Sequence, residues 1–174
     1  VAHVSCLARQ AKILVAEGLE NSLDNEAMNE RWEKRYRCSL CEQQYHGVVR
    51  CALGWACWKT YLGRPEADPL RRLAMEGLGN GLTEARLHED ALPVREAELA
   101  MLQRVGVPEA YMLSTMGNLA GSYATLGRFE ECSRLQRGVY SSRLKLYGEE
   151  HGQTLVAANN YALSLLKLER FEEA

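Results

Sequence analysis

The stretch Asn118–Glu131, NLAGSYATLGRFEE, decides the fold of this chain. It returns 42 residues later as Asn160–Glu173, NYALSLLKLERFEE, and eight of the fourteen positions are identical. A period of about 40 residues is typical of helical repeat arrays, in which each hairpin has an apolar face that the next hairpin covers. The repetition therefore predicts an all-α stack of helical hairpins, an architecture that presents a surface for holding another molecule.

The residues of this stretch also follow helical spacing. One stripe of an α-helix is formed by positions i, i+4, i+7 and i+11, which here hold Met116, Ala120, Tyr123 and Gly127. The same periodicity, with Gly and Pro as stop signals, predicts the other helices. They are expected near 5–18, 45–62, 68–83, 87–105, 109–126, 129–147, 152–168 and from 170 onward. Residues 21–37 are expected to form either a helix or an exposed segment without regular structure.

Three glycines interrupt the helix predicted at 68–83. Gly77, Gly79 and Gly81 stand at i, i+2 and i+4, and each costs about 1 kcal/mol relative to Ala in a helix interior. A helix that keeps them needs a compensating gain, and we expect that gain to be the close approach of a second helix.

The pattern around the opening stretch resembles a tetratricopeptide repeat. It reads Leu119-Ala120-x-x-Tyr123-x-x-Leu126-Gly127-Arg128-x-Glu130-Glu131-Cys132, with Cys132 where a small Ala is usual. The 42-residue period and the connection beginning Tyr147-Gly148-Glu149-Glu150-His151 resemble the kinesin-light-chain type. The second copy has Glu169 in place of the usual Gly, and a more degenerate copy begins at Leu78-Gly79.

The resemblance implies a right-handed superhelical stack over residues 67–174. It divides into repeats at about 67–106 and 107–148 and an incomplete repeat at 149–174, and residues 45–66 would form a capping helix. In that helix Trp55 and Trp58 are expected to cover the first repeat.

Polar residues recur at the repeat spacing and are candidates for binding a partner. They are Asn118, Ser122, Asn160 and Ser164. An Asn side chain can donate to and accept from a peptide backbone, and in kinesin-light-chain-like repeats an Asn at this position is implied to contact the bound peptide. The alternative is that these residues are solvated, or that Asn118 bonds within its own repeat.

A second motif lies near the N-terminus. His3-Val-Ser-Cys6-Leu7 is followed by Cys38-Ser-Leu-Cys41 and then Tyr45. This order resembles the C-terminal half of a RING-CH zinc finger, so residues 1–44 are expected to be a truncated zinc-finger-like segment. The resemblance implies that His3 and Cys6 ligate one zinc ion, that Cys38 and Cys41 ligate a second, and that the remaining ligands precede Val1. It also implies a ubiquitin-conjugating enzyme as a partner.

Two other interpretations of the cysteines remain open. Cys38, Cys41, His46 and Cys51 have the spacing of a CCHC zinc knuckle, a module that binds single-stranded nucleic acid. Trp55, Trp58, Arg50 and Lys59 could then stack on and pair with RNA. Alternatively no metal binds, Cys51 and Cys57 are thiols of a helix core, and His46 caps a helix.

Net charge and hydrophobicity further limit the classes of function that are possible. The net charge is −2, so no general basic field favours nucleic acid. No apolar run approaches the roughly 20 residues of a membrane helix, and Val1 begins no signal-peptide pattern. We expect a cytoplasmic location and interpret the chain as a fragment of a longer protein. No catalytic arrangement is evident, although such groups need meet only in space.

The function favoured by the sequence is a protein-interaction scaffold that binds a peptide or partner helix in the concave groove of the array. One alternative is the substrate-recognition part of a RING-CH-type E3 ubiquitin ligase, with zinc bound in the longer protein. Another is RNA binding through the CCHC knuckle, which the charge makes the weaker expectation.

Overall fold

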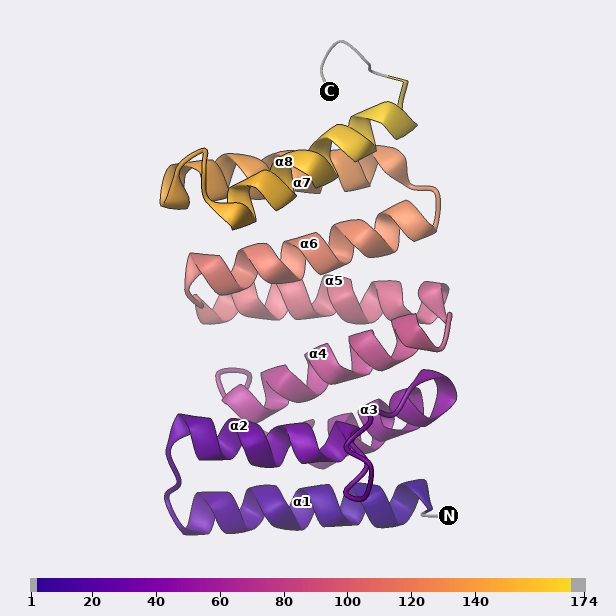
Figure 1. Cartoon of the computed structure of the whole chain (residues 1–174), viewed down its shortest axis with the longest axis vertical. Coiled ribbons are helices and arrows are strands. Elements are labelled where there is room, and N and C mark those ends of the chain that lie inside the picture. The colour runs from indigo at the N-terminus through magenta and orange to yellow at the C-terminus, as the bar shows by residue number, and fades with distance from the viewer. Residues whose placement is uncertain (1–2, 170–174) are drawn as a thin grey trace. The chain divides into compact units, whose positions relative to one another are not determined.

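The computed structural model describes residues 3–169, and the regular elements in that range are helices (Figure 1). The elements are α1 (Val4–Glu20), α2 (Asn25–Glu33), the 3-10 helix η1 (Lys34–Tyr36), α3 (Gly47–Tyr61), α4 (Pro69–Glu84), α5 (His88–Val105), α6 (Glu109–Thr125), α7 (Phe129–Tyr147) and α8 (Gly152–Lys167). Within the described residues the only β pairing is an isolated bridge between Arg37 and Gln44. The all-α prediction is confirmed, while the helix expected from 170 onward lies outside the described residues.

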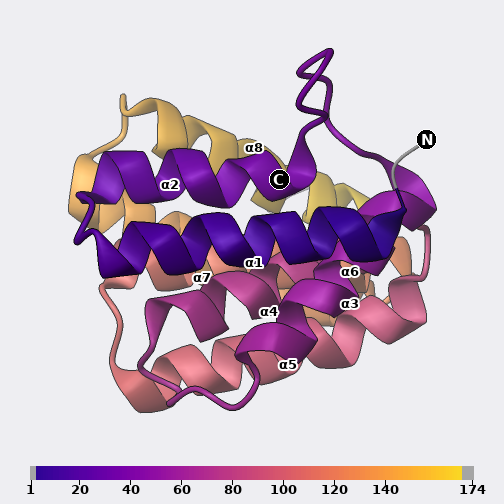
Figure 2. The same ribbon diagram turned by 90° about the horizontal axis from the view of Figure 1, so that it is seen from below.

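The chain forms two compact units, Val1–Leu87 and His88–Ala174. The first unit begins with α1 and α2, which lie side by side and run in opposite directions (Figures 1 and 2). The turn between them places Ser22 in the left-handed region, at φ 50°. Asp24 then caps α2 by accepting a hydrogen bond from the Ala27 N–H at 2.9 Å. Residues 4–33, which the sequence assigned to a zinc segment, therefore form a helical hairpin.

Helices α3 and α4 pack at backbone distance, which explains the glycines. A Cβ placed on Gly81 would lie 2.9 Å from both the carbonyl oxygen of Arg50 and the Cα of Cys51. A Cβ on Gly54 would lie 3.0 Å from the carbonyl oxygen of Gly77. A side chain of any size at Gly54 or Gly81 would separate the two helices, so the predicted close approach is confirmed at Gly81, with α3 as the second helix. A Cβ on Gly77 would instead meet the Tyr36 hydroxyl of η1.

Aromatic residues fill the core of the first unit. Trp32 and Tyr61 pack with ring centroids 5.7 Å apart, and Tyr36 and Cys57 belong to the same buried cluster. Trp58 packs against this core, but Trp55 is 42% exposed. The expectation that Trp55 covers the first repeat is wrong, because Gly54 occupies the side of α3 that faces α4.

The second unit contains the repeat from which the fold was predicted. Ala120 and Tyr123 of α6 and Cys132 of α7 are buried in one cluster with Leu92 of α5. Between α6 and α7, Gly127 adopts φ 73° and its N–H donates to the Ala124 carbonyl at 3.1 Å, while the next N–H, of Arg128, reaches back to the Tyr123 carbonyl at 2.9 Å. This is the left-handed termination common at helix C-termini.

The equivalent positions one repeat away have the same conformation without glycine. Arg86, after α4, has φ 61°, and Glu169, after α8, has φ 59°. A left-handed residue other than Gly costs roughly 1–2 kcal/mol, so the termination of α4 and α8, rather than residue preference, sets the backbone at Arg86 and Glu169.

Side chains of the opening stretch join three helices of the second unit. The Tyr123 hydroxyl donates to Glu96 Oε1 of α5 at 2.6 Å. The Arg128 guanidinium lies 4.5 Å from the Tyr123 ring centroid and donates to Glu131 Oε1 of α7 at 2.6 Å. The residues that revealed the repeat therefore also hold α5, α6 and α7 together.

The helix contact at Gly81 provides a test of the first unit. Gly81→Ala should lower the free energy of unfolding by about 1–3 kcal/mol, because the added methyl group forces α3 and α4 apart. Gly121→Ala on α6, where an added Cβ meets nothing within 4 Å, should instead raise it by up to about 1 kcal/mol. Urea unfolding followed by circular dichroism measures both, and a stabilising Gly81→Ala would contradict the close approach.

Candidate functional site

The two asparagines predicted to contact a partner are exposed. Asn118 lies on α6 and Asn160 on α8, 42 residues apart. Leu119 and Ala120, which follow Asn118 on α6, are 3% and 0% exposed, so the Asn118 side chain is presented to solvent by a helix whose other side lies in the core. Nothing in the described part of the chain engages either amide side chain.

The two serines predicted with them are placed differently. Ser122 is 6% and Ser164 is 4% exposed. Each hydroxyl donates within its own helix, Ser122 to the Asn118 carbonyl at 3.3 Å and Ser164 to the Tyr161 carbonyl at 2.7 Å. Buried and already hydrogen-bonded, these hydroxyls cannot reach a partner outside the helices, and only the asparagines of the predicted set remain available.

A polar hollow of about 320 Å³ lies between α7 and α8. Arg134, Arg137 and Glu130 line it from α7, and Tyr161, the neighbour of Asn160, lines it from α8. The Tyr161 ring stacks on Tyr140 with centroids 6.4 Å apart, which positions that wall. Arg134 and Arg137 were not predicted as site residues from the sequence. The only sequence pattern that could have indicated them is their i, i+3 spacing, which puts both on one face of a helix.

The C-x-x-C motif forms a short hairpin loop that follows α2 and η1 and projects to the side of α1 (Figure 2). The Cys38 N–H donates to the Gln43 carbonyl, and the Glu42 N–H donates to the Cys38 carbonyl, both at 2.9 Å. Glu42 adopts φ 57° to close the turn. The backbone N–H groups of Cys41 and then Leu40 hydrogen-bond the Cys38 sulfur and lower the pKa of its thiol. They favour the thiolate, which is the form that binds metals.

The C-x-x-C loop also borders the largest hollow beside α1, of about 490 Å³. Cys38 and Tyr45 line it from the loop, and Leu7 and Leu14 line it from α1. The helix that follows His3-x-x-Cys6-Leu7 thus lies against the C-x-x-C loop, which is an arrangement that the sequence order alone did not specify.

The predicted zinc ligands occur as two pairs. Cys6, Cys38 and Cys41 are free thiols, and His3 stands at the N-cap of α1. Among residues 3–169 no group of three or more His, Cys, Asp or Glu side chains could hold a metal ion. His3 with Cys6 and Cys38 with Cys41 therefore supply at most half of a tetrahedral site each.

The alternative CCHC set is not brought together. Cys51 is 7% exposed inside α3, where the α3–α4 contact covers it. His46 is the N-cap residue of α3, and its Nδ1 lies 3.7 Å from Glu84 Oε2 of α4. The prediction of a knuckle from Cys38, Cys41, His46 and Cys51 is wrong because helix α3 starts at Gly47 and carries Cys51 into the core.

A buried arginine is the least expected polar feature of the first unit. Arg35 of η1 is 4% exposed, and its guanidinium carbon lies 3.6 Å from the Trp32 ring centroid and 5.6 Å from that of Tyr61. One of its N–H groups donates to the Cys57 sulfur. Among the described residues no carboxylate pairs with Arg35, and its Nε has no hydrogen-bond partner.

The surroundings of Arg35 do not neutralise its charge. Burial raises the pKa of the Cys57 thiol from 9.0 to about 11, so that thiol is uncharged at neutral pH. Burying an ion costs several kcal/mol, and desolvated cation–π contacts return about 2 kcal/mol. The aromatic rings around Arg35 therefore compensate only part of the cost.

Comparison with known proteins supports the repeat assignment. Residues 111–174 match the tetratricopeptide repeat family, whose members generally mediate protein–protein interactions. No curated protein matches the sequence. Within the described residues no helix has the length and apolar character needed to cross a membrane.

Two solved structures have a similar fold. One contains nearly identical TPR-like repeats of a kinesin light chain from Podosopora anserina; it aligns with a TM-score of 0.65 and 16% identity over 99% of this chain and 72% of that one. A variant of the same protein aligns with a TM-score of 0.59 and 17% identity, over 99% of this chain and 91% of that one. The alignment includes the N-terminal helices, so neither comparison supports a RING-CH segment there.

The Cys57 thiol gives the first unit a predictable pH dependence. Its pKa is higher in the folded state, so its contribution to stability is complete below pH 9 and is lost as the pH rises toward about 11. Over that interval wild-type protein should lose about 2 kcal/mol more unfolding free energy than Cys57→Ala. Because all three tryptophans lie in the first unit, tryptophan fluorescence during urea unfolding reports this change, and parallel pH profiles would contradict it.

Proposed function

We propose that the chain is a protein-interaction scaffold that binds an extended peptide or a partner helix along α6 and α8, with Asn118 and Asn160 as the recurring contacts. The observation that carries this proposal is the exposure of both asparagines at the same repeat position, one on α6 and one on α8. A stack of helical hairpins presents an extended surface that suits the binding of a partner.

The chemistry of the asparagines fits an extended backbone. Each side-chain amide offers two donors and one acceptor oxygen, which complement the N–H and C=O of a peptide bond. Two such groups at one repeat spacing fix the path of a ligand without selecting its side chains. The neighbouring hollow adds selectivity, because Arg134 and Arg137 favour acidic side chains while Glu130 favours basic ones.

The double substitution Asn118→Ala with Asn160→Ala tests this proposal. Peptides selected from a random display library against the 174-residue protein provide the ligands, and fluorescence anisotropy measures their affinity. We expect the double variant to bind these peptides about tenfold or more weakly, because each lost side-chain hydrogen bond contributes about 1 kcal/mol. Thermal unfolding should be unchanged, since both side chains are exposed.

The matched control is Asn159→Ala, which removes the same group from the adjacent exposed position of α8 but does not fall on the repeated position. Selected peptides should bind this variant as tightly as wild type. Equal binding to wild type and to the double variant would show that the asparagines are solvated residues with no role in recognition.

A second candidate function rests on the C-x-x-C loop. We propose that Cys38 and Cys41 contribute two thiolate ligands to a zinc ion, as in a RING-CH-type ligase, with His3 and Cys6 belonging to a second zinc. The supporting observations are the two N–H donors to the Cys38 sulfur, the hairpin closed at Glu42, and the hollow shared by the loop and α1. Bound zinc would tie the loop to other ligands and would support a ubiquitin-conjugating enzyme as partner.

Cobalt binding tests whether Cys38 and Cys41 act as metal ligands. Co²⁺ titrated into the reduced protein should produce thiolate-to-metal charge-transfer absorption with the intensity of two thiolates and with weak affinity, because two protein ligands leave a tetrahedral ion incomplete. Cys38→Ser with Cys41→Ser should abolish it, whereas Cys51→Ala, at a buried thiol, should leave it unchanged. Absorption that persists without Cys38 and Cys41 would contradict the proposed ligands.

A further inference from the structure

We propose that the C-x-x-C loop is a thiol–disulfide exchange site, at which a small-molecule disulfide such as oxidised glutathione oxidises Cys38 and Cys41 to an intraloop disulfide. This role goes beyond the scaffold function and does not depend on zinc. The same two sulfurs are the ligands of the proposed zinc site, so a bound metal ion and the disulfide exclude each other.

The first observation is that the two sulfurs meet. The Cys41 thiol donates a hydrogen bond to the Cys38 sulfur, which also accepts from the backbone N–H groups of Cys41 and Leu40. Residues three apart in a tight turn typically lie within about 7 Å of each other at Cα, and a disulfide typically joins Cα atoms about 4.4–6.8 Å apart. The pair can therefore close into a disulfide without rearrangement of the loop.

The second observation is that backbone hydrogen bonds fix the chain around both cysteines. At the base of the loop the Tyr45 N–H donates to the Tyr36 carbonyl at 2.8 Å. Inside the loop the Glu42 N–H donates to the Cys38 carbonyl at 2.9 Å, which closes the turn that contains both thiols. Because folding holds the two thiols together, their reaction with each other is favoured over reaction with separate molecules.

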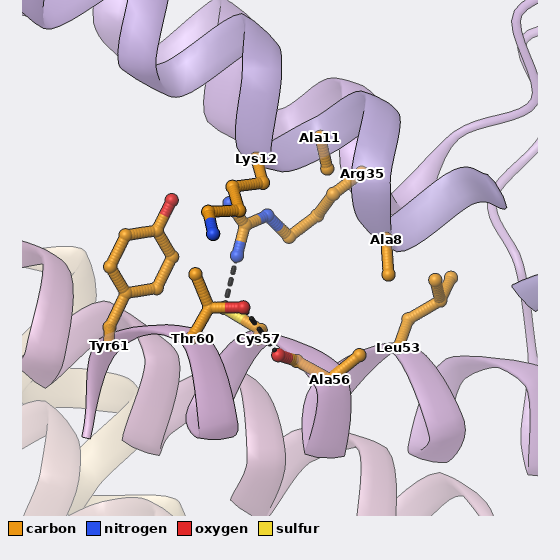
Figure 3. Close-up of a pocket in the computed structure, with 9 residues that line it drawn as sticks. All are labelled: Ala8, Ala11, Lys12, Arg35, Leu53, Ala56, Cys57, Thr60 and Tyr61. Atoms are coloured by element: carbon orange, nitrogen blue, oxygen red, sulfur yellow. Dashed lines mark hydrogen bonds between the residues drawn. The ribbon is translucent and has the colours of Figure 1, made fainter. Parts of the chain in front are cut away.

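The third observation is access from solvent. Cys41 is exposed and Cys38 is partly exposed. Cys38 also lines the hollow of about 490 Å³ beside α1, a volume within the range of small-molecule sites. Cys57 provides the contrast, because it is buried in α3 and Arg35 of η1 donates to its sulfur (Figure 3). Two further cysteines, in α3 and α7, are also buried and closed to a reagent.

The exchange proceeds in two steps, beginning at Cys38 because its side chain lines the hollow. The Cys38 thiol loses its proton to solvent, and its sulfur attacks one sulfur of the small disulfide, which forms a mixed disulfide and releases one thiolate. The Cys41 thiol then loses its proton, and its sulfur attacks the Cys38 sulfur and expels the second thiolate. Two protein thiols are oxidised, the small disulfide is reduced, and solvent returns the two protons to the released thiolates.

Oxidation of the reduced, metal-free 174-residue protein tests the proposal. The protein is equilibrated with reduced and oxidised glutathione in the presence of EDTA, free thiols are alkylated, and the peptide that contains Cys38 and Cys41 is analysed by mass spectrometry. We expect a fraction of this peptide to lack two hydrogens and to carry no alkyl group. The equilibrium constant for this oxidation should be about tenfold or more larger in the folded protein than in urea, because the folded loop holds the two thiols together. Equal oxidation in both states would overturn the proposal.

Single substitutions separate the two steps. Cys41→Ser should stop the reaction at the mixed disulfide between Cys38 and glutathione, because no second thiol displaces it. The matched control is Cys6→Ser, which removes the other exposed thiol and should leave the oxidation of Cys38 and Cys41 unchanged. A mixed disulfide that persists on Cys38 in the wild-type protein, or a disulfide between Cys38 and Cys6, would contradict the proposal. Because oxidation is measured without metal, its outcome is independent of the cobalt titration.

Discussion

The left-handed residue that ends a helix is the constraint on which the other contacts depend. Ser22, Arg86, Gly127 and Glu169 all adopt it, with φ between 50° and 73°. At Ser22, Arg86 and Gly127 the N–H of the next residue donates to the carbonyl five positions earlier, which closes the helix. Once that geometry is fixed, an apolar stripe such as Ala120 and Tyr123 must face the following helix, and residues such as Asn118 are left facing solvent.

The same turn explains why the N-terminal residues are a helical hairpin. Between α1 and α2 the hydrogen bonds from Ser22 and Leu23 reproduce those from Gly127 and Arg128. Glu26 and Ala27 follow Ser22 at the spacing at which Glu131 and Cys132 follow Gly127. This similarity in spacing is a weak sequence signal for a helical hairpin, because Ser rarely occupies a left-handed position. The Cys-x-x-Cys spacing in the same region is more conspicuous and favours zinc.

The chain combines two kinds of polar feature with different physical origins. The second unit presents exposed amides at repeat spacing, where they cost little and can engage a partner. The first unit buries Arg35 among aromatic rings, where its charge is only partly compensated, and projects a C-x-x-C loop with a stabilised thiolate. Neither a buried cation nor a thiol of lowered pKa is needed for the stacking of the helices.

Sequence alone determined most of the helices, their approximate ends and the close contact at Gly81, because helical periodicity, turn signals and the cost of glycine act locally along the chain. Only the tertiary structure decided which polar residues are available. Ser122 and Asn118 share the repeat pattern, yet the serine is buried and the asparagine exposed, because burial depends on helices that arrive from elsewhere in the sequence. Tertiary packing against α4 also separates Cys51 from the other residues of its predicted ligand set. The burial of Arg35 likewise depends on tertiary packing, and no local sequence pattern predicts it.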